Sequence, residues 1–281
     1  MSPVKVSHTF DLDTELLKQH QNSPLETNAE HNSTTILLIH TLFSSGKHWN
    51  CTKEILIEKE RFDVLAPDLL PEQLSNCDKC VSYLANQVKE KARNGKAHVV
   101  GLSAGAHIAV KLAAAYPSIV SSVLISGLVT YPALLRPLTI LPIYVIKRMM
   151  SKIYGGPAFT LRESTSITGL LAPLWDLQNF EVRIMIVAGL RHDDPQPALA
   201  LKRVLSSRCV DAQVKGGRNL RHCWNLQRPD LFAKLIVAWV DNVWSDDLEK
   251  HFIDLPDVKR KRRREHVYKA SRRLLFRRDK A

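Results

Sequence analysis

The sequence predicts an α/β protein with a mostly parallel sheet, helices on both faces of that sheet and a short helical insertion. Strand-like apolar runs alternate with segments of helical periodicity, and this alternation is typical of a parallel sheet covered on both sides. The first run, residues 34–40, is built of β-branched residues and leucine up to a histidine, as expected of a strand buried on both faces. A chain of 281 residues is also long enough to bury one large core.

The other elements follow in order, and their ends are marked by Gly, Pro and breaks in the apolar spacing. The clearest helix covers residues 72–93, with Leu74, Val81, Leu84 and Val88 at helical spacing before Asn94-Gly95. In chain order we expect a helix over 48–57, a strand over 62–67 that ends in proline, the helix over 72–93, a strand over 97–102, a helix after Ser103, strands over 121–126 and 183–189, a helix over 195–205, a short last strand over 209–214 and a closing helix over 230–243.

Residues 127–180 interrupt the alternation. They are apolar, but five prolines break them up. Part of this segment, residues 128–146, is apolar enough to suggest a membrane span, although its three prolines and Arg136 argue against one. We therefore expect a helical insertion, about residues 128–180, that forms a lid or a pocket wall above the carboxyl ends of the strands.

The net charge of +12 is concentrated at one end of the chain. Residues 258–281 hold twelve Lys and Arg against two acidic residues, which accounts for ten of those charges. The remainder is nearly neutral, so no specific nucleic-acid partner is expected. Six consecutive basic residues, Lys259 to Arg264, leave three interpretations of the tail open. It is a basic helix on an anionic membrane, a signal for an import receptor, or a solvated disordered extension.

These features divide the chain into a polar N-terminal extension (1–33), a folded domain (34–250) and a basic tail (251–281). The extension has no apolar core of a signal peptide, and the cysteine count of five is odd. Both features favour a reducing, cytoplasmic location, with nuclear or membrane-surface association through the tail as alternatives. Cys77 and Cys80 form a Cys-x-x-Cys without a second ligand pair nearby, so we expect packing and no metal.

The pentapeptide Gly101-Leu102-Ser103-Ala104-Gly105 lies between an expected strand and an expected helix. A serine on such a sharp turn is the pattern of a nucleophile elbow. The flanking glycines are needed because side chains there would clash with the neighbouring strand or helix. The alternative is a glycine-rich turn with a bystander serine.

A serine nucleophile needs a base, and the base needs an orienting acid. After an elbow serine, the acid is expected beyond a later strand and the histidine near the closing helix. Asp193 and Asp194 occupy the first position and His222 the second. We favour Asp193, because Asp194 precedes Pro195 and is suited to capping a helix. The other histidines fit other positions: His98 a buried strand, His107 a packed helix, and His192 a pocket wall or a supporting position.

The oxyanion formed by acyl transfer needs two backbone N–H donors. Ala104, the residue after the serine, is expected to supply one, and Leu42, in the loop after the first strand, the other. Phe43 and Trp49 are candidates for the acyl pocket, although aromatic residues at strand ends are more often core.

Several motifs together make the chain resemble the α/β-hydrolase fold superfamily over about residues 34–245. They are His40-Thr41, Asp63 to Asp68, Gly101 to Gly105, Val187 to Gly189 with Asp193-Asp194, and Arg221 to Asn225. The resemblance implies Ser103 as nucleophile, Asp193 as acid and His222 as base. It also implies Leu42 and Ala104 as the oxyanion hole. The chain departs from the pattern at Thr41, where glycine is usual.

Together these observations predict a cofactor-free serine hydrolase that cleaves an ester or related acyl bond of a hydrophobic small molecule. The apolar insertion favours a hydrophobic acyl group. Thioesterase, peroxidase or C–C bond hydrolase chemistry on the same fold remains open. A binding protein that keeps the fold without catalysis is the alternative from another class.

Overall fold

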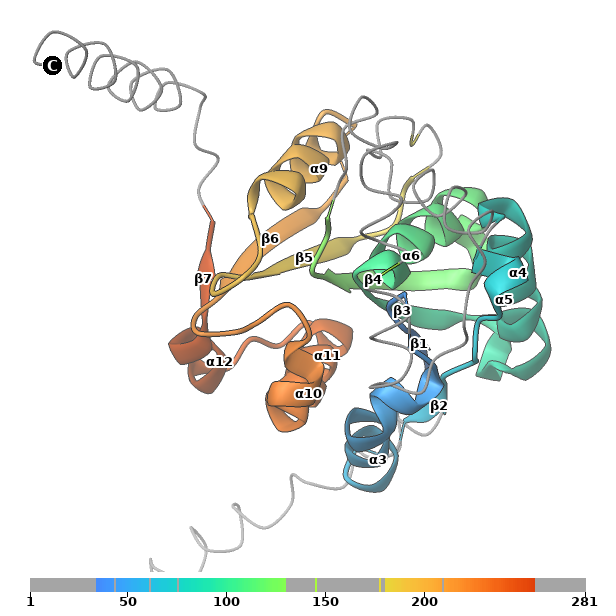
Figure 1. Ribbon diagram of the computed structural model, residues 1–281, viewed down its shortest axis with the longest axis horizontal. Coiled ribbons are helices and arrows are strands. Elements are labelled where there is room, and N and C mark those ends of the chain that lie inside the picture. The colour runs from blue at the N-terminus through green and yellow to red at the C-terminus, as the bar shows by residue number, and fades with distance from the viewer. Residues whose placement is uncertain are drawn as a thin grey trace, which may run out of the picture.

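Seven strands form the sheet at the centre of the molecule. A computed structural model describes residues 34–42, 44–60, 62–74, 76–129, 145, 177, 180–208 and 210–255. The strands are β1 (Thr35–Ile39), β2 (Asp63–Leu65), β3 (Ala97–Leu102), β4 (Val120–Ser126), β5 (Ile184–Gly189), β6 (Ala212–Gly217) and β7 (Phe252–Asp254). Their order in space is β2-β1-β3-β4-β5-β6-β7, and each pair is parallel except β6 with β7 (Figure 1). The predicted fold class is confirmed.

Helices cover both faces of this sheet (Figure 1). One face carries α4 (Pro71–Leu74), α5 (Cys77–Lys91), α6 (Ala104–Ala115) and α9 (Gln196–Ser206). The other carries α3 (Asn50–Glu58), α10 (Trp224–Gln227), α11 (Pro229–Asp241) and α12 (Asp246–His251). Short 3-10 turns complete the described part: η1 (Gly46–Trp49), η2 (Arg93–Gly95) and η3 (Pro117–Ile119).

Each face of the sheet has its own apolar core. Leu37 and Ile39 of β1 point to the α5–α6 side, whereas Ile36 and Leu38 point to the α3–α11 side. This alternation requires β1 to be apolar at every position, which explains the continuous run in the sequence. On the α3–α11 side, Phe232 lies between two buried tryptophans, with ring centroids 5.3 Å from Trp49 and 4.2 Å from Trp224.

The helix expected over 72–93 is two helices, and this expectation was wrong. Asn76 has an extended backbone with φ −130°, and its side chain accepts a hydrogen bond from the Lys79 N–H at 3.1 Å. An asparagine that caps a helix in this way starts a new one, α5, in spite of the continuous apolar spacing across both helices.

The position predicted for the last strand was also wrong. The expected strand over 209–214 is β6, which begins three residues later, and the closing helix α11 is followed by α12 and by the strand β7, antiparallel to β6. Residues 252–254 therefore belong to the sheet, although the sequence analysis assigned them to the tail. A strand of three residues is too short to show periodicity, and Phe252 is the only one of the three that is buried.

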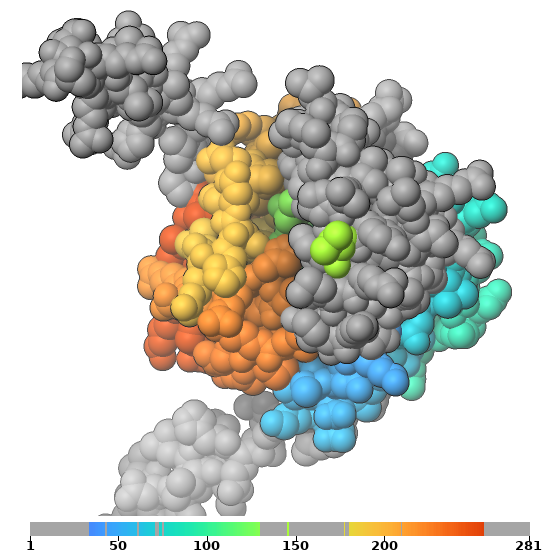
Figure 2. All heavy atoms as spheres, viewed as in Figure 1, coloured from blue at the N-terminus to red at the C-terminus, as the bar shows by residue number. Residues whose placement is uncertain are grey.

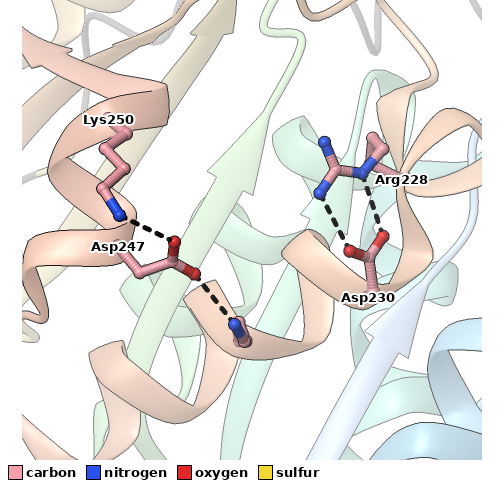
Figure 3. Close-up of polar contacts among 5 residues, drawn as sticks. Arg228, Asp230, Asp247 and Lys250 are labelled. Carbon is pink, nitrogen blue, oxygen red and sulfur yellow. Dashed lines mark hydrogen bonds and ion pairs between the residues drawn. The ribbon is translucent and has the colours of Figure 1, made fainter.

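Ion pairs connect the final helices at the surface (Figure 3). Arg228 pairs with Asp230 in the first turn of α11, with 2.9 Å between Nη2 and Oδ2. Asp247 of α12 accepts a 2.8 Å bond from Lys234 of α11 and lies 3.6 Å from Lys250. All five side chains are exposed, and such pairs contribute only about 0–1 kcal/mol each, so they add little to stability.

The expected insertion, most of residues 128–180, lies outside the described residues, as do the N-terminal extension, Phe43 and the basic tail from residue 256. Within the described residues, no helix is long and apolar enough to cross a membrane. The same residues contain no group of three or more His, Cys, Asp or Glu side chains placed to hold a metal ion. Cys80 is buried in the core beside α6, in agreement with a packing role.

Candidate active site

Ser103 lies on the sharp turn that joins β3 to α6. Its backbone has φ 58° and ψ −112°, a left-handed conformation that is rare for residues other than glycine. Such a conformation costs about 1–3 kcal/mol and is held only where the surrounding structure enforces it. The Ser103 N–H donates to the Ser126 carbonyl at 2.9 Å, which fixes the turn against the end of β4.

The two glycines of the turn allow its backbone to pack closely. A Cβ on Gly101 would collide with the carbonyl oxygen of Gly105, and a Cβ on Gly105 would collide with that of Ile39. The start of α6 thus rests directly on the carboxyl end of β1. This contact brings the loop that carries Leu42 beside the first turn of α6.

Asp193 and His222 form a hydrogen-bonded pair across the sheet edge. The Nδ1 of His222 lies 2.7 Å from Asp193 Oδ1, and the second carboxylate oxygen accepts the Gly189 N–H at 2.8 Å. The Asp193 side chain is only 4% exposed, whereas that of His222 is 31% exposed. Because a carboxylate can only accept, Nδ1 carries the proton and the lone pair of the neutral ring is on Nε2.

Asp194 does not contact His222 in this way. Its Oδ1 accepts the Gln196 N–H at 3.0 Å, at the start of α9, and its side chain faces solvent. The structure therefore separates the two neighbouring aspartates by position, one against the histidine and one at a helix end.

The segments that carry these residues adjoin at the molecular surface. In the space-filling view, the region around α9 is yellow and the region around α10 and α11 is orange, and they meet on one face (Figure 2). Asp193 precedes α9 and His222 precedes α10, so the bond between them joins these two parts of the chain.

Ser103 and His222 both lie against the end of β4. Leu102 pairs with Ser126, and the next residue, Gly127, has φ 64° and lies beneath the His222 ring. A Cβ on Gly127 would be 2.8 Å from His222 Cε1 and 3.0 Å from Nδ1. Ser103 and the His222 imidazole therefore flank the same two residues, Ser126 and Gly127. Gly127 was not among the predicted site residues, although a glycine directly after a strand was a usable signal.

Two further contacts hold the His222 loop. The Nε1 of Trp224 donates to the Ser126 hydroxyl at 2.8 Å, and both groups are buried. Gly189 lies under the loop, because a Cβ there would be 2.6 Å from the Arg221 carbonyl oxygen. The loop is thus fixed to the ends of β4 and β5, the strands that lead to Gly127 and to Asp193.

His40 organises the loop after β1. Its Nε2 accepts the Leu69 N–H at 3.0 Å, so Nδ1 carries the proton and donates to the Thr41 carbonyl at 2.8 Å. Burial lowers the pKa of His40, and the ring stays neutral in this position. The Leu42 side chain packs in the core, and Ala104 is the first residue of α6, where amides have no acceptor within the helix.

The other histidines have structural contacts. His98 Nδ1 lies 2.7 Å from the Ser122 hydroxyl, between neighbouring strands. His107 Nε2 donates to the Val129 carbonyl at 2.7 Å, and burial lowers the pKa of each ring to about 4. His192 is exposed on the turn before Asp193.

Residues 36–267 match the model of the alpha/beta hydrolase family, which covers most of the chain. The chain belongs to this family. An AB hydrolase superfamily protein from Gibberella zeae is 31% identical to it over 227 residues, or 73% of this chain and 79% of that relative.

Solved structures of other proteins share the fold. A thermophilic esterase from Thermogutta terrifontis is 16% identical, with a TM-score of 0.56 over 75% of this chain and 91% of the esterase. A monoacylglycerol lipase from Paleococcus ferrophilus is 13% identical, with a TM-score of 0.55 over 74% of this chain and 94% of the lipase. At such identities the likeness concerns the fold alone.

Proposed function

We propose that this alpha/beta hydrolase is a cofactor-free serine hydrolase that cleaves an ester or related acyl bond of a hydrophobic small molecule. Membership of the family supports a hydrolase. The observation that carries the finer proposal is the Asp193–His222 bond of 2.7 Å at the end of β4, where the strained Ser103 also lies.

The contacts support a role for each residue in acyl transfer. The Ser103 hydroxyl attacks the substrate carbonyl carbon while His222 Nε2 takes its proton. Asp193 keeps Nδ1 protonated and stabilises the imidazolium, and the backbone N–H groups of Ala104 and Leu42 stabilise the oxyanion.

His222 then gives its proton to the leaving oxygen, which departs as an alcohol and leaves an acyl group on Ser103. A water molecule, deprotonated by His222, attacks the acyl-enzyme, releases the carboxylic acid and returns the proton to the Ser103 oxygen. Each proton, the acyl group and the leaving alcohol are accounted for in these steps without a cofactor. The hydrophobic acyl group is inferred from the apolar composition of residues 128–180.

The test combines a fluorophosphonate probe with a panel of nitrophenyl esters and acyl thioesters. We expect the probe to label the wild type, and Ser103→Ala to abolish labelling. Both Ser103→Ala and His222→Ala should lower turnover by about 10³-fold or more while the fold is retained. A matched control is Ser121→Ala, which alters an exposed serine of β4 and should leave labelling unchanged.

Different outcomes distinguish the remaining alternatives. Faster release from thioesters than from esters would reassign the enzyme as a thioesterase. A folded wild type that is neither labelled nor active would favour a binding protein and refute the proposal.

A further inference from the structure

A buried histidine and a buried asparagine join two distant parts of the chain near the candidate site. His48 lies in η1 and Asn225 in α10, and they are 177 residues apart in sequence. The Asn225 Nδ2 donates to the His48 carbonyl at 3.1 Å, which fixes the orientation of the amide. Its Oδ1 then faces His48 Nε2 at 3.2 Å, so that nitrogen carries a proton and donates it.

The two partners belong to the segments that hold the proposed catalytic groups. His48 follows Leu42 on the segment that leaves β1, while Asn225 follows His222 and the anchored Trp224. Both members of the pair are at least nine-tenths buried. Two hydrogen bonds in such a place fix the separation and angle of the segments, because leaving buried polar groups unpaired costs about 1–3 kcal/mol each.

The charge of His48 also suits this position. Burial, with smaller contributions from the nearby His40 and His222, lowers its pKa to about 4, against the hydrogen bond to Asn225, which raises it. His48 is therefore neutral at pH 7. A neutral donor can connect the segments without adding a positive charge that would oppose protonation of His222 during acyl transfer.

We propose that His48 and Asn225 are positioning residues that set the loop carrying Leu42 relative to the His222 imidazole. The proposal rests on the function proposed above. The pair acts through the two segments and not on the substrate, so its removal should slow the chemical step more than it weakens substrate binding. A misplacement of about 1 Å can cost about 10²-fold in rate.

The test measures kcat and KM for ester hydrolysis by His48→Leu, Asn225→Leu and the double variant. We expect kcat to fall by about 10- to 100-fold in each single variant, with KM changed by less than about threefold. The double variant should be no slower than the slower single variant, since both substitutions break the same connection.

Two polar variants at position 48 separate positioning from folding. Gln carries its amide nitrogen at about the reach of the histidine Nε2, so His48→Gln should recover most of the wild-type kcat. His48→Asn is one methylene shorter and should not. Equal kcat values in these two variants would overturn the proposal, even if His48→Leu fails to fold.

A matched control is His98→Leu, which removes a partly buried histidine that is bonded to a serine between β3 and β4. His98 lies about 16 Å along the strand from Ser103 at the usual rise per residue. This variant should melt at a lower temperature but keep the kcat of the wild type.

Failure of the inference differs from failure of the proposed function. An active wild type with an unchanged kcat in His48→Leu, or additive effects in the double variant, overturns the positioning role alone. A wild type without turnover or Ser103 labelling refutes the proposed function and the positioning role together.

Discussion

Lowering the pH from 7 to 5 should destabilise the folded protein, because buried histidines, His48 and His107 among them, resist protonation. Burial lowers the pKa of His48 and of His107 to about 4, from an ordinary value of 6.5. For His107 the contacts explain the resistance. Its Nε2 donates to the Val129 carbonyl, while the buried Nδ1 has no hydrogen-bond partner among the described residues, so a proton there would meet no acceptor among them.

The sign and size of the effect follow from these pKa values. Between pH 6.5 and 4 the unfolded chain binds protons that the folded chain does not. The stabilisation is therefore complete above pH 6.5, is lost as the pH falls toward 4, and is constant below 4. From pH 7 to pH 5 each of the two histidines removes about 2 kcal/mol from the free energy of unfolding. Their sum is a large part of the stability of an ordinary domain, which is about 5–15 kcal/mol.

The assay is urea unfolding at several pH values between 7 and 5, with wild type and His107→Gln. Glutamine can still donate to Val129 but does not titrate, so this variant should lower the mean slope of unfolding free energy against pH over this window by about 1 kcal/mol per pH unit. The exposed Asp230 and Asp247 have lowered pKa values and act only below pH 3.8, outside this window. A His107→Gln variant with the wild-type slope, or a stability that does not change between pH 7 and 5, would refute the reasoning.

Two comparisons test the geometry of the candidate site. Asp193→Asn should lower kcat by about 10⁴-fold, since an amide favours the wrong imidazole tautomer, whereas Asp194→Asn keeps a good helix cap and should leave kcat unchanged. A slower Asp194→Asn enzyme in ester hydrolysis would reverse the two roles. Gly127→Ala should lower kcat at least about tenfold, because the new Cβ meets His222, while Gly95→Ala has the same positive φ and open space and should cost only stability. Equal kcat values in the two alanine variants would contradict the contact with His222.

The strands and the sharp turn at Ser103 were predictable because their signals are local. β1, β3 and β5 each coincide with a continuous apolar run, and Gly101 to Gly105 show the turn in five consecutive residues. β7 was not predictable, since a three-residue strand has no period of its own and forms only where β6 offers an edge.

By itself the sequence determined the fold class, the order of the elements and the short set of candidates for the site. It could not place Asp193 against His222 with certainty, because both neighbouring aspartates fit the same position along the chain. Only the tertiary structure decided between them, by turning one carboxylate toward His222 and the other toward the start of α9. It also brought together Gly127 with His222 and His48 with Asn225. These pairs lie far apart in sequence, and their contacts arise from the way parallel strands align their carboxyl ends, which no local pattern of residues records.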